Sequence, residues 1–112
     1  MNRFSAFAFA GFGLAVALVA LPSAARAQSP AEQRGMTFVR ANCAGCHSID
    51  KVSPSPLRPA PPFRDLHLRY PVESLAESLA EGIRTGHPSM PEFRLDPGQI
   101  RDVMGYLKSL ER

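Results

Sequence analysis

The residues with the most distinctive chemistry are the two cysteines of the chain, in Cys43-Ala44-Gly45-Cys46-His47. A disulfide between them would close a very small loop and add little stability, because the entropic benefit of a disulfide grows with loop length. A redox-active dithiol would need a preceding strand and a βαβ pattern, and neither is present. A structural zinc site would need a second ligand pair, whereas His67 and His87 are isolated residues.

The C-x-x-C-H spacing is the attachment signature of c-type haem. Two thiols at this spacing can reach the two vinyl groups on one porphyrin edge, and the adjacent His47 can reach the iron. Ala44 and Gly45 are small, so the backbone can pass close to the ring edge. The sequence therefore predicts one haem c, attached covalently through Cys43 and Cys46, with His47 as an iron ligand.

The second axial ligand decides the chemistry, because an open iron site binds gas or peroxide, whereas a methionine closes the site and raises the reduction potential. Met90 lies in a loop between helical segments, and prolines before and after it restrict its backbone. His87 is the alternative ligand, but it is so near Met90 that only one of the two can reach the iron. The Met90-Pro91 pair favours Met90. Two other methionines fall in helical patterns and are expected to fill the core: Met36 and Met104.

These motifs resemble those of a small class I cytochrome c of the bacterial periplasmic kind, with one haem and His/Met ligation. The resemblance rests on the C-x-x-C-H motif, on Met90-Pro91-Glu92-Phe93 before the last helix, and on Ala60-Pro61-Pro62-Phe63 between them. It implies an all-α, cytochrome c-like fold with three to four helices packed around one covalently bound haem. In that family a proline carbonyl accepts a hydrogen bond from the axial histidine, which here implies Pro61 or Pro62, with Pro61 the better match.

Capping signals predict the first and last helices. Residues 29–32 form a Ser-Pro-Ala-Glu capping box that opens a helix running to about Asn42, and residues 96–99 open the last helix in the same way. The resemblance implies that these two helices cross near a glycine and an aromatic residue. The residues expected at this crossing are Gly35, Phe38 and Tyr106.

An apolar stripe predicts a third helix that begins at Pro71-Val72 and is ended by Gly82 and Gly86. A short helical turn is expected at residues 63–68. The proline-rich residues 52–62 are expected to wrap the haem edge as a stiff loop. No alternating strand pattern is present.

The start of the chain has the organisation of a secretory signal peptide: Arg3, an uncharged apolar stretch over residues 4–21, and Ala25-Arg26-Ala27 at the peptidase site. We expect residues 1–27 to be removed and residues 28–112 to form the cytochrome c domain. The expected location is the periplasm, without a stable membrane anchor. An uncleaved leader would instead tether the protein to the membrane, facing the periplasm, because its length is just within the range of a spanning helix.

Charge argues against a nucleic-acid partner. The 13 basic residues include Arg3 and Arg26 of the leader, so the remainder nearly balances the 10 acidic residues and forms no basic block. We expect a monomeric one-electron carrier that exchanges electrons with redox proteins, and not an enzyme. One alternative is a dedicated electron-accepting subunit of a periplasmic dehydrogenase. Another is a gas-binding or peroxidatic haem protein, which would need Met90 to be off the iron.

Overall fold

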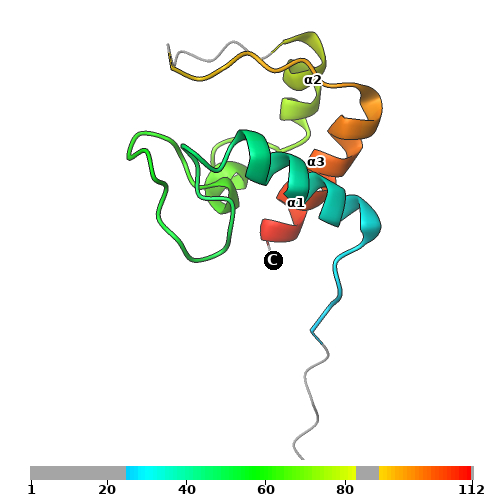
Figure 1. The fold of residues 1–112 in the computed structure, drawn as a ribbon, viewed down its shortest axis with the longest axis horizontal. Coiled ribbons are helices and arrows are strands. Elements are labelled where there is room, and N and C mark those ends of the chain that lie inside the picture. The colour runs from blue at the N-terminus through cyan, green and yellow to red at the C-terminus, as the bar shows by residue number, and fades with distance from the viewer. Residues whose placement is uncertain (1–24, 83–88, 112) are drawn as a thin grey trace, which may run out of the picture.

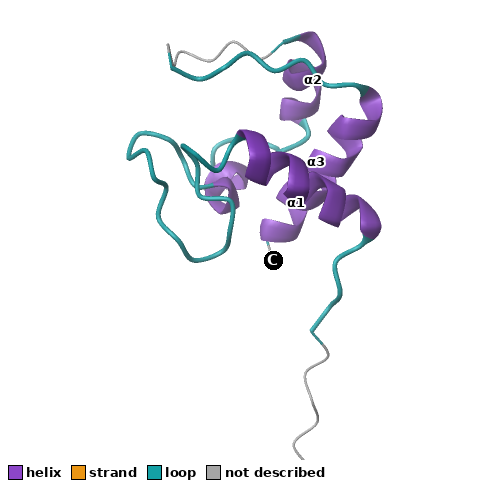
Figure 2. Ribbon diagram, in the orientation of Figure 1, coloured by secondary structure: helices purple, strands orange, loops and turns teal. Residues whose placement is uncertain are grey.

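The computed structural model describes residues 25–82 and 89–111, which form an all-helical domain (Figures 1 and 2). The elements in chain order are α1 (Pro30–Asn42), the 3-10 helix η1 (Phe63–Leu68), α2 (Ser74–Glu81) and α3 (Pro97–Leu110). The described residues contain no strand. The predicted all-α fold with three to four helices is therefore confirmed.

Predictions that concern residues 1–24, Gly86 and His87 fall outside the described part of the chain. Within residues 25–82 and 89–111, no helix has the length and apolar character needed to cross a membrane.

Both helices that the capping signals predict begin where expected. At the start of α1, the Glu32 N–H donates to Ser29 Oγ at 3.2 Å, and the Ser29 N–H donates to the Glu32 carboxylate at 2.7 Å. At the start of α3, the Gln99 N–H donates to Asp96 Oδ1 at 2.9 Å, and the Asp96 N–H donates to Gln99 Oε1 at 3.1 Å. These reciprocal pairs satisfy N–H groups that have no partner within the helix.

The α2 helix begins at Ser74, later than the predicted start at Pro71. The N–H of Ser74 donates to the Pro71 carbonyl at 3.0 Å, and the N–H of Leu75 donates to the Val72 carbonyl at 3.0 Å. These bonds span three residues, so the segment before Ser74 is a tight turn and not α-helix. At the other end, Gly82 has φ 105° and stops the helix, as predicted. The η1 helix covers the predicted residues 63–68.

The α1 and α3 helices cross each other (Figure 1), and Gly35 of α1 lies at their close approach. A Cβ atom added to Gly35 would lie 2.0 Å from the Asp102 backbone oxygen and 2.9 Å from the Tyr106 Cβ. The predicted contact of Gly35 with Tyr106 is therefore confirmed. The Phe38 ring, also expected at this crossing, instead packs edge-to-face on Phe93, with 6.4 Å between the ring centroids.

We predict that Gly35→Ala lowers the free energy of unfolding by about 1–3 kcal/mol or more, because the added methyl group meets backbone that can move only if the helices separate. Gly105→Ala is the matched control, since a Cβ there would come no closer than 4.0 Å to Glu32 Cγ. Denaturant unfolding of both variants tests this. Equal stability of Gly35→Ala and the unmodified protein would contradict the close crossing.

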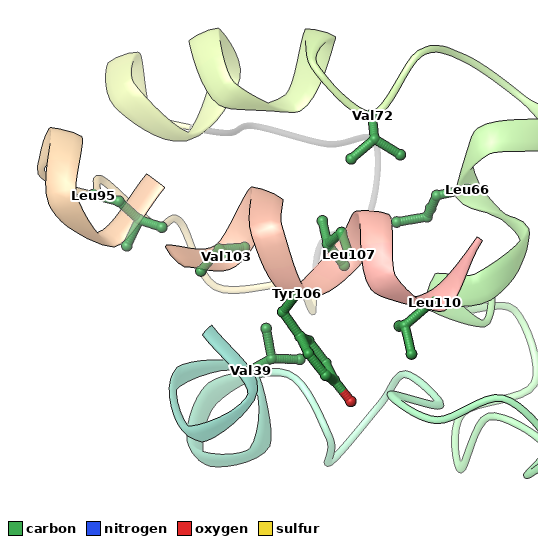
Figure 3. Close-up of a cluster of buried hydrophobic side chains, with 8 residues drawn as sticks. All are labelled: Val39, Leu66, Val72, Leu95, Val103, Tyr106, Leu107 and Leu110. Carbon is green, nitrogen blue, oxygen red and sulfur yellow. The ribbon is translucent and has the colours of Figure 1, made fainter. Parts of the chain in front are cut away.

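The core lies along α3, where eight buried side chains from α1, η1, α3 and the connecting segments meet (Figure 3). They are Val39, Leu66, Val72, Leu95, Val103, Tyr106, Leu107 and Leu110. Met36 and Met104 pack against this cluster, as predicted from their helical positions. A core of this size supplies little stability on its own, which fits a domain that needs a bound group to complete it.

An ion pair joins the outer faces of α1 and α3. Arg34 donates to the Asp102 carboxylate from Nε at 2.7 Å and from Nη2 at 2.8 Å. The hydrogen bond from Arg34 is the main cause that lowers the pKa of Asp102 below its usual value. A carboxylate with a lowered pKa stabilises the fold above its unfolded pKa of about 3.9, and this contribution is lost as the pH falls through the lower folded value.

We therefore predict that Asp102→Asn melts at a lower temperature than the unmodified protein at neutral pH. The difference should be constant above about pH 5 and should shrink in acid, as Asp102 becomes protonated in the unmodified protein. Thermal melts from pH 7 down to strongly acidic solution measure this. A difference that does not change with pH would contradict a role for the Asp102 charge.

Candidate functional site

The C-x-x-C-H motif forms a turn directly after α1. Cys43 caps the helix, and its N–H donates to the Val39 carbonyl at 2.8 Å. The N–H groups of Cys46 and His47 then both donate to the Cys43 carbonyl, at 3.1 and 3.0 Å. This turn brings both thiols and the imidazole to the wall of one cavity.

The His47 ring is oriented by Pro61. The distance from His47 Nδ1 to the Pro61 carbonyl oxygen is 2.8 Å. A carbonyl oxygen can only accept, so Nδ1 carries the hydrogen, and the tautomer with this hydrogen has its free lone pair on Nε2. The Phe63 ring packs against the imidazole, with 4.7 Å between centroids. Of the two prolines that the sequence left open, the structure places Pro61 beside the imidazole, in the arrangement that orients metal-binding histidines.

Met90 lines the same cavity as Cys43, Cys46 and His47. The cavity has a volume of about 380 Å³. A second hollow of about 110 Å³ shares Cys43, His47 and Met90 and extends to the core at Val39. The larger volume falls within the range of roughly 300–1,000 Å³ typical of cofactor pockets.

The walls of both hollows fit an apolar macrocycle, because among the described residues no Asp, Glu, Lys or Arg side chain lines either of them. The walls consist mainly of aliphatic, proline and aromatic residues, among them Leu57, Pro59, Ala60, Phe63, Pro91 and Phe93. The donor set also fits haem: two thiols for covalent attachment, an imidazole nitrogen and a thioether sulfur for iron.

The competing interpretations of the cysteines fit less well. Cys43 and Cys46 are not joined by a disulfide. Burial raises the pKa of the Cys43 thiol to about 11, whereas redox-active dithiols have a lowered pKa that yields the reactive thiolate. In the described ranges no group of three or more His, Cys, Asp or Glu side chains is placed to hold a metal ion. His67 is exposed on η1 and does not line the cavity.

Arg64 has a structural role near the site that the sequence analysis did not identify. Its Nη1 donates to the Ser53 carbonyl at 2.8 Å, to Ser48 Oγ at 3.2 Å and to the Asp50 carbonyl at 3.3 Å. These bonds hold the first part of the predicted haem-edge loop. From the other side, the Tyr106 hydroxyl donates to the carbonyl of residue 49 at 2.6 Å. A single arginine after Phe63 gives no sequence signal for contacts that depend on how the loop folds back.

The fold and the cavity together define a class of protein: a small all-helical domain with a haem-attachment turn and a methionine in one apolar cavity. The comparison with known families agrees, because residues 32–111 match the family described as Cytochrome c. The chain belongs to the cytochrome c family and is a class I c-type cytochrome, a haem-based electron carrier. Its cofactor is haem c, which this family binds covalently, and Cys43 and Cys46 are the cysteines present for attachment. No curated protein and no solved structure matched the chain.

Proposed function

We propose that this protein is a periplasmic one-electron carrier in which Cys43 and Cys46 hold the haem and His47 and Met90 are the axial ligands. The observation that carries this proposal is that all four side chains line one cavity, and that no described Asp, Glu, Lys or Arg lines it with them. Bound haem supplies one-electron chemistry, as its iron alternates between Fe(II) and Fe(III).

The surrounding residues support these roles. The Pro61 carbonyl fixes the His47 tautomer with Nε2 free, which makes the imidazole a better ligand. The Met90 thioether is a weak, polarisable ligand that raises the reduction potential. With His47 and Met90 both bound to the iron, no position would remain for a substrate, so the proposed role is electron transfer and not catalysis.

Partners would meet the cavity, whose described lining residues include no Asp, Glu, Lys or Arg. Leu57 is 42% exposed, and Pro59 and Pro91 are exposed beside it. A small apolar patch of this kind suits brief, weak docking to a redox protein that gives or takes one electron. We propose that the carrier is a monomer with separate donor and acceptor proteins.

The periplasmic location rests on the leader. We propose cleavage after Ala27, so that residues 28–112 form the mature protein. Residues 25–29 lie outside any helix and are exposed, which suits access by a peptidase. The intact mass of the purified protein tests this: the mature chain plus one haem is expected, and a mass that retains residues 1–27 would support the tethered alternative.

A potentiometric titration with a carbon monoxide control tests the proposed activity. A one-electron curve and a ferrous spectrum that carbon monoxide does not change are expected. A spectrum that shifts with carbon monoxide would show an open iron and support the gas-binding or peroxidatic alternative. Recovery from cells in a stoichiometric complex with a dehydrogenase would instead support the dedicated-subunit alternative.

A further inference from the structure

Arg94 joins the segment that carries Met90 to the C-terminal end of α2. Its Nη2 donates to the Glu81 carbonyl oxygen at 2.9 Å. Glu81 is the last residue of α2, so no N–H group of the helix donates a hydrogen bond to its carbonyl. A guanidinium at a helix C-terminus also interacts favourably with the helix dipole. This bond therefore satisfies a helix end and fixes the neighbouring segment at once.

Leu95, the next residue, is also hydrogen-bonded to the end of α2. The N–H of Leu95 donates to the Leu79 carbonyl at 2.8 Å, and this carbonyl also belongs to the last turn of α2. On the other side of Arg94, the Phe93 ring packs against Phe38 of α1. Three consecutive residues thus attach the segment to two helices, and Met90 lies a few residues before them at the cavity wall.

Gly82 makes this approach possible. A Cβ atom at Gly82 would lie 2.6 Å from Glu92 Oε1 and 3.6 Å from Arg94 Nη2. Both side chains therefore lie close over Gly82, and the φ of 105° there favours glycine. The end of α2 is shaped to receive this segment.

We propose that Arg94 is a positioning residue for Met90, holding the segment against α2 so that the thioether stays at the iron. This inference rests on the proposed function, since it requires Met90 to be a ligand. An external ligand must displace the thioether to bind. Every interaction that is present only while Met90 is in place therefore lowers the affinity of the iron for the external ligand. The bond from Arg94 to Glu81 is such an interaction because Arg94 is only four residues after Met90 in the same segment. Neither Arg94 nor Glu81 lines the cavity itself.

The test measures imidazole binding to the ferric holo-protein of Arg94→Ala, Arg94→Lys and the control Arg101→Ala, which removes an exposed arginine of α3. Arg94→Ala is expected to bind imidazole about tenfold more tightly, equivalent to about 1.4 kcal/mol. Its weak far-red band from Met–iron ligation should also decrease. Arg94→Lys should be intermediate, since an ammonium can still donate to the Glu81 carbonyl. Arg101→Ala should match the unmodified protein.

The test separates a failure of the inference about Arg94 from a failure of the Met90 ligand assignment. If the unmodified protein shows the Met–iron band and Arg94→Ala binds imidazole no more tightly, the inference about Arg94 is overturned and the proposed function stands. The inference is also overturned if Arg94→Ala only lowers the unfolding temperature and leaves imidazole affinity unchanged. An unmodified protein without the band overturns both the inference and the ligand assignment on which it rests.

Discussion

Cys46→Ser is expected to leave most of the protein without covalently bound haem and largely unfolded. Cys46 lines the cavity, and the adjoining hollow reaches the core at Val39. Without haem, these apolar walls lose their packing partner, and a core of this size supplies only about 3–5 kcal/mol. Folding and haem attachment are therefore coupled, as folding and metal binding are in small metal-binding domains.

Haem staining after denaturing electrophoresis measures covalent attachment, and circular dichroism measures helix content. Arg101→Ala is the control, because Arg101 is exposed on α3 and does not line the cavity. The control should keep both haem and helix content. A soluble Cys46→Ser protein that is fully folded without haem would contradict the view that haem completes the core.

The second large effect is expected from Met90→Ala. Haem should stay attached, because both cysteines remain, but the iron should become open to external ligands. The reduction potential should fall by roughly 100 mV or more, since axial ligands set haem potentials over about 0.8 V. Potentiometry and the ferric and ferrous spectra, with and without carbon monoxide, measure both changes.

Met36→Leu provides the control for Met90→Ala. Met36 packs against the core from α1, and leucine has a similar volume, so its spectrum and potential should match those of the unmodified protein. If Met90→Ala also left the spectrum and potential unchanged, Met90 would be excluded as an iron ligand.

Local signals explain why much of the fold was predictable from sequence. The capping residues of α1 and α3 lie next to the N–H groups that they satisfy, so a short motif is sufficient to place each helix start. The approach of α1 to α3 at Gly35 followed from a family resemblance and not from local pattern. The predicted start of α2 at Pro71 was wrong. The apolar stripe of the helix extends back to Val72, but the carbonyls of Pro71 and Val72 accept the hydrogen bonds of a tight turn.

The site, like the fold, has features that local sequence determines and others that depend on how the chain folds. The grouping of Cys43, Cys46 and His47 follows from their spacing, because one turn contains all three. The choice of Pro61 over Pro62 depends on how a proline-rich loop folds back on His47, which local pattern does not determine. The same holds for Arg94, whose partner is a backbone carbonyl of another helix. A backbone carbonyl has no side-chain identity for a sequence to reveal.

The optical spectrum of the exported mature protein, oxidised and then reduced, tests the central claim most directly. Ligation by His47 and Met90 predicts a low-spin spectrum with a weak far-red band in the ferric state, and no change on addition of carbon monoxide to the ferrous state. A high-spin or ligand-sensitive spectrum would contradict the closed iron site. A colourless protein from cells able to attach haem would contradict the haem site itself.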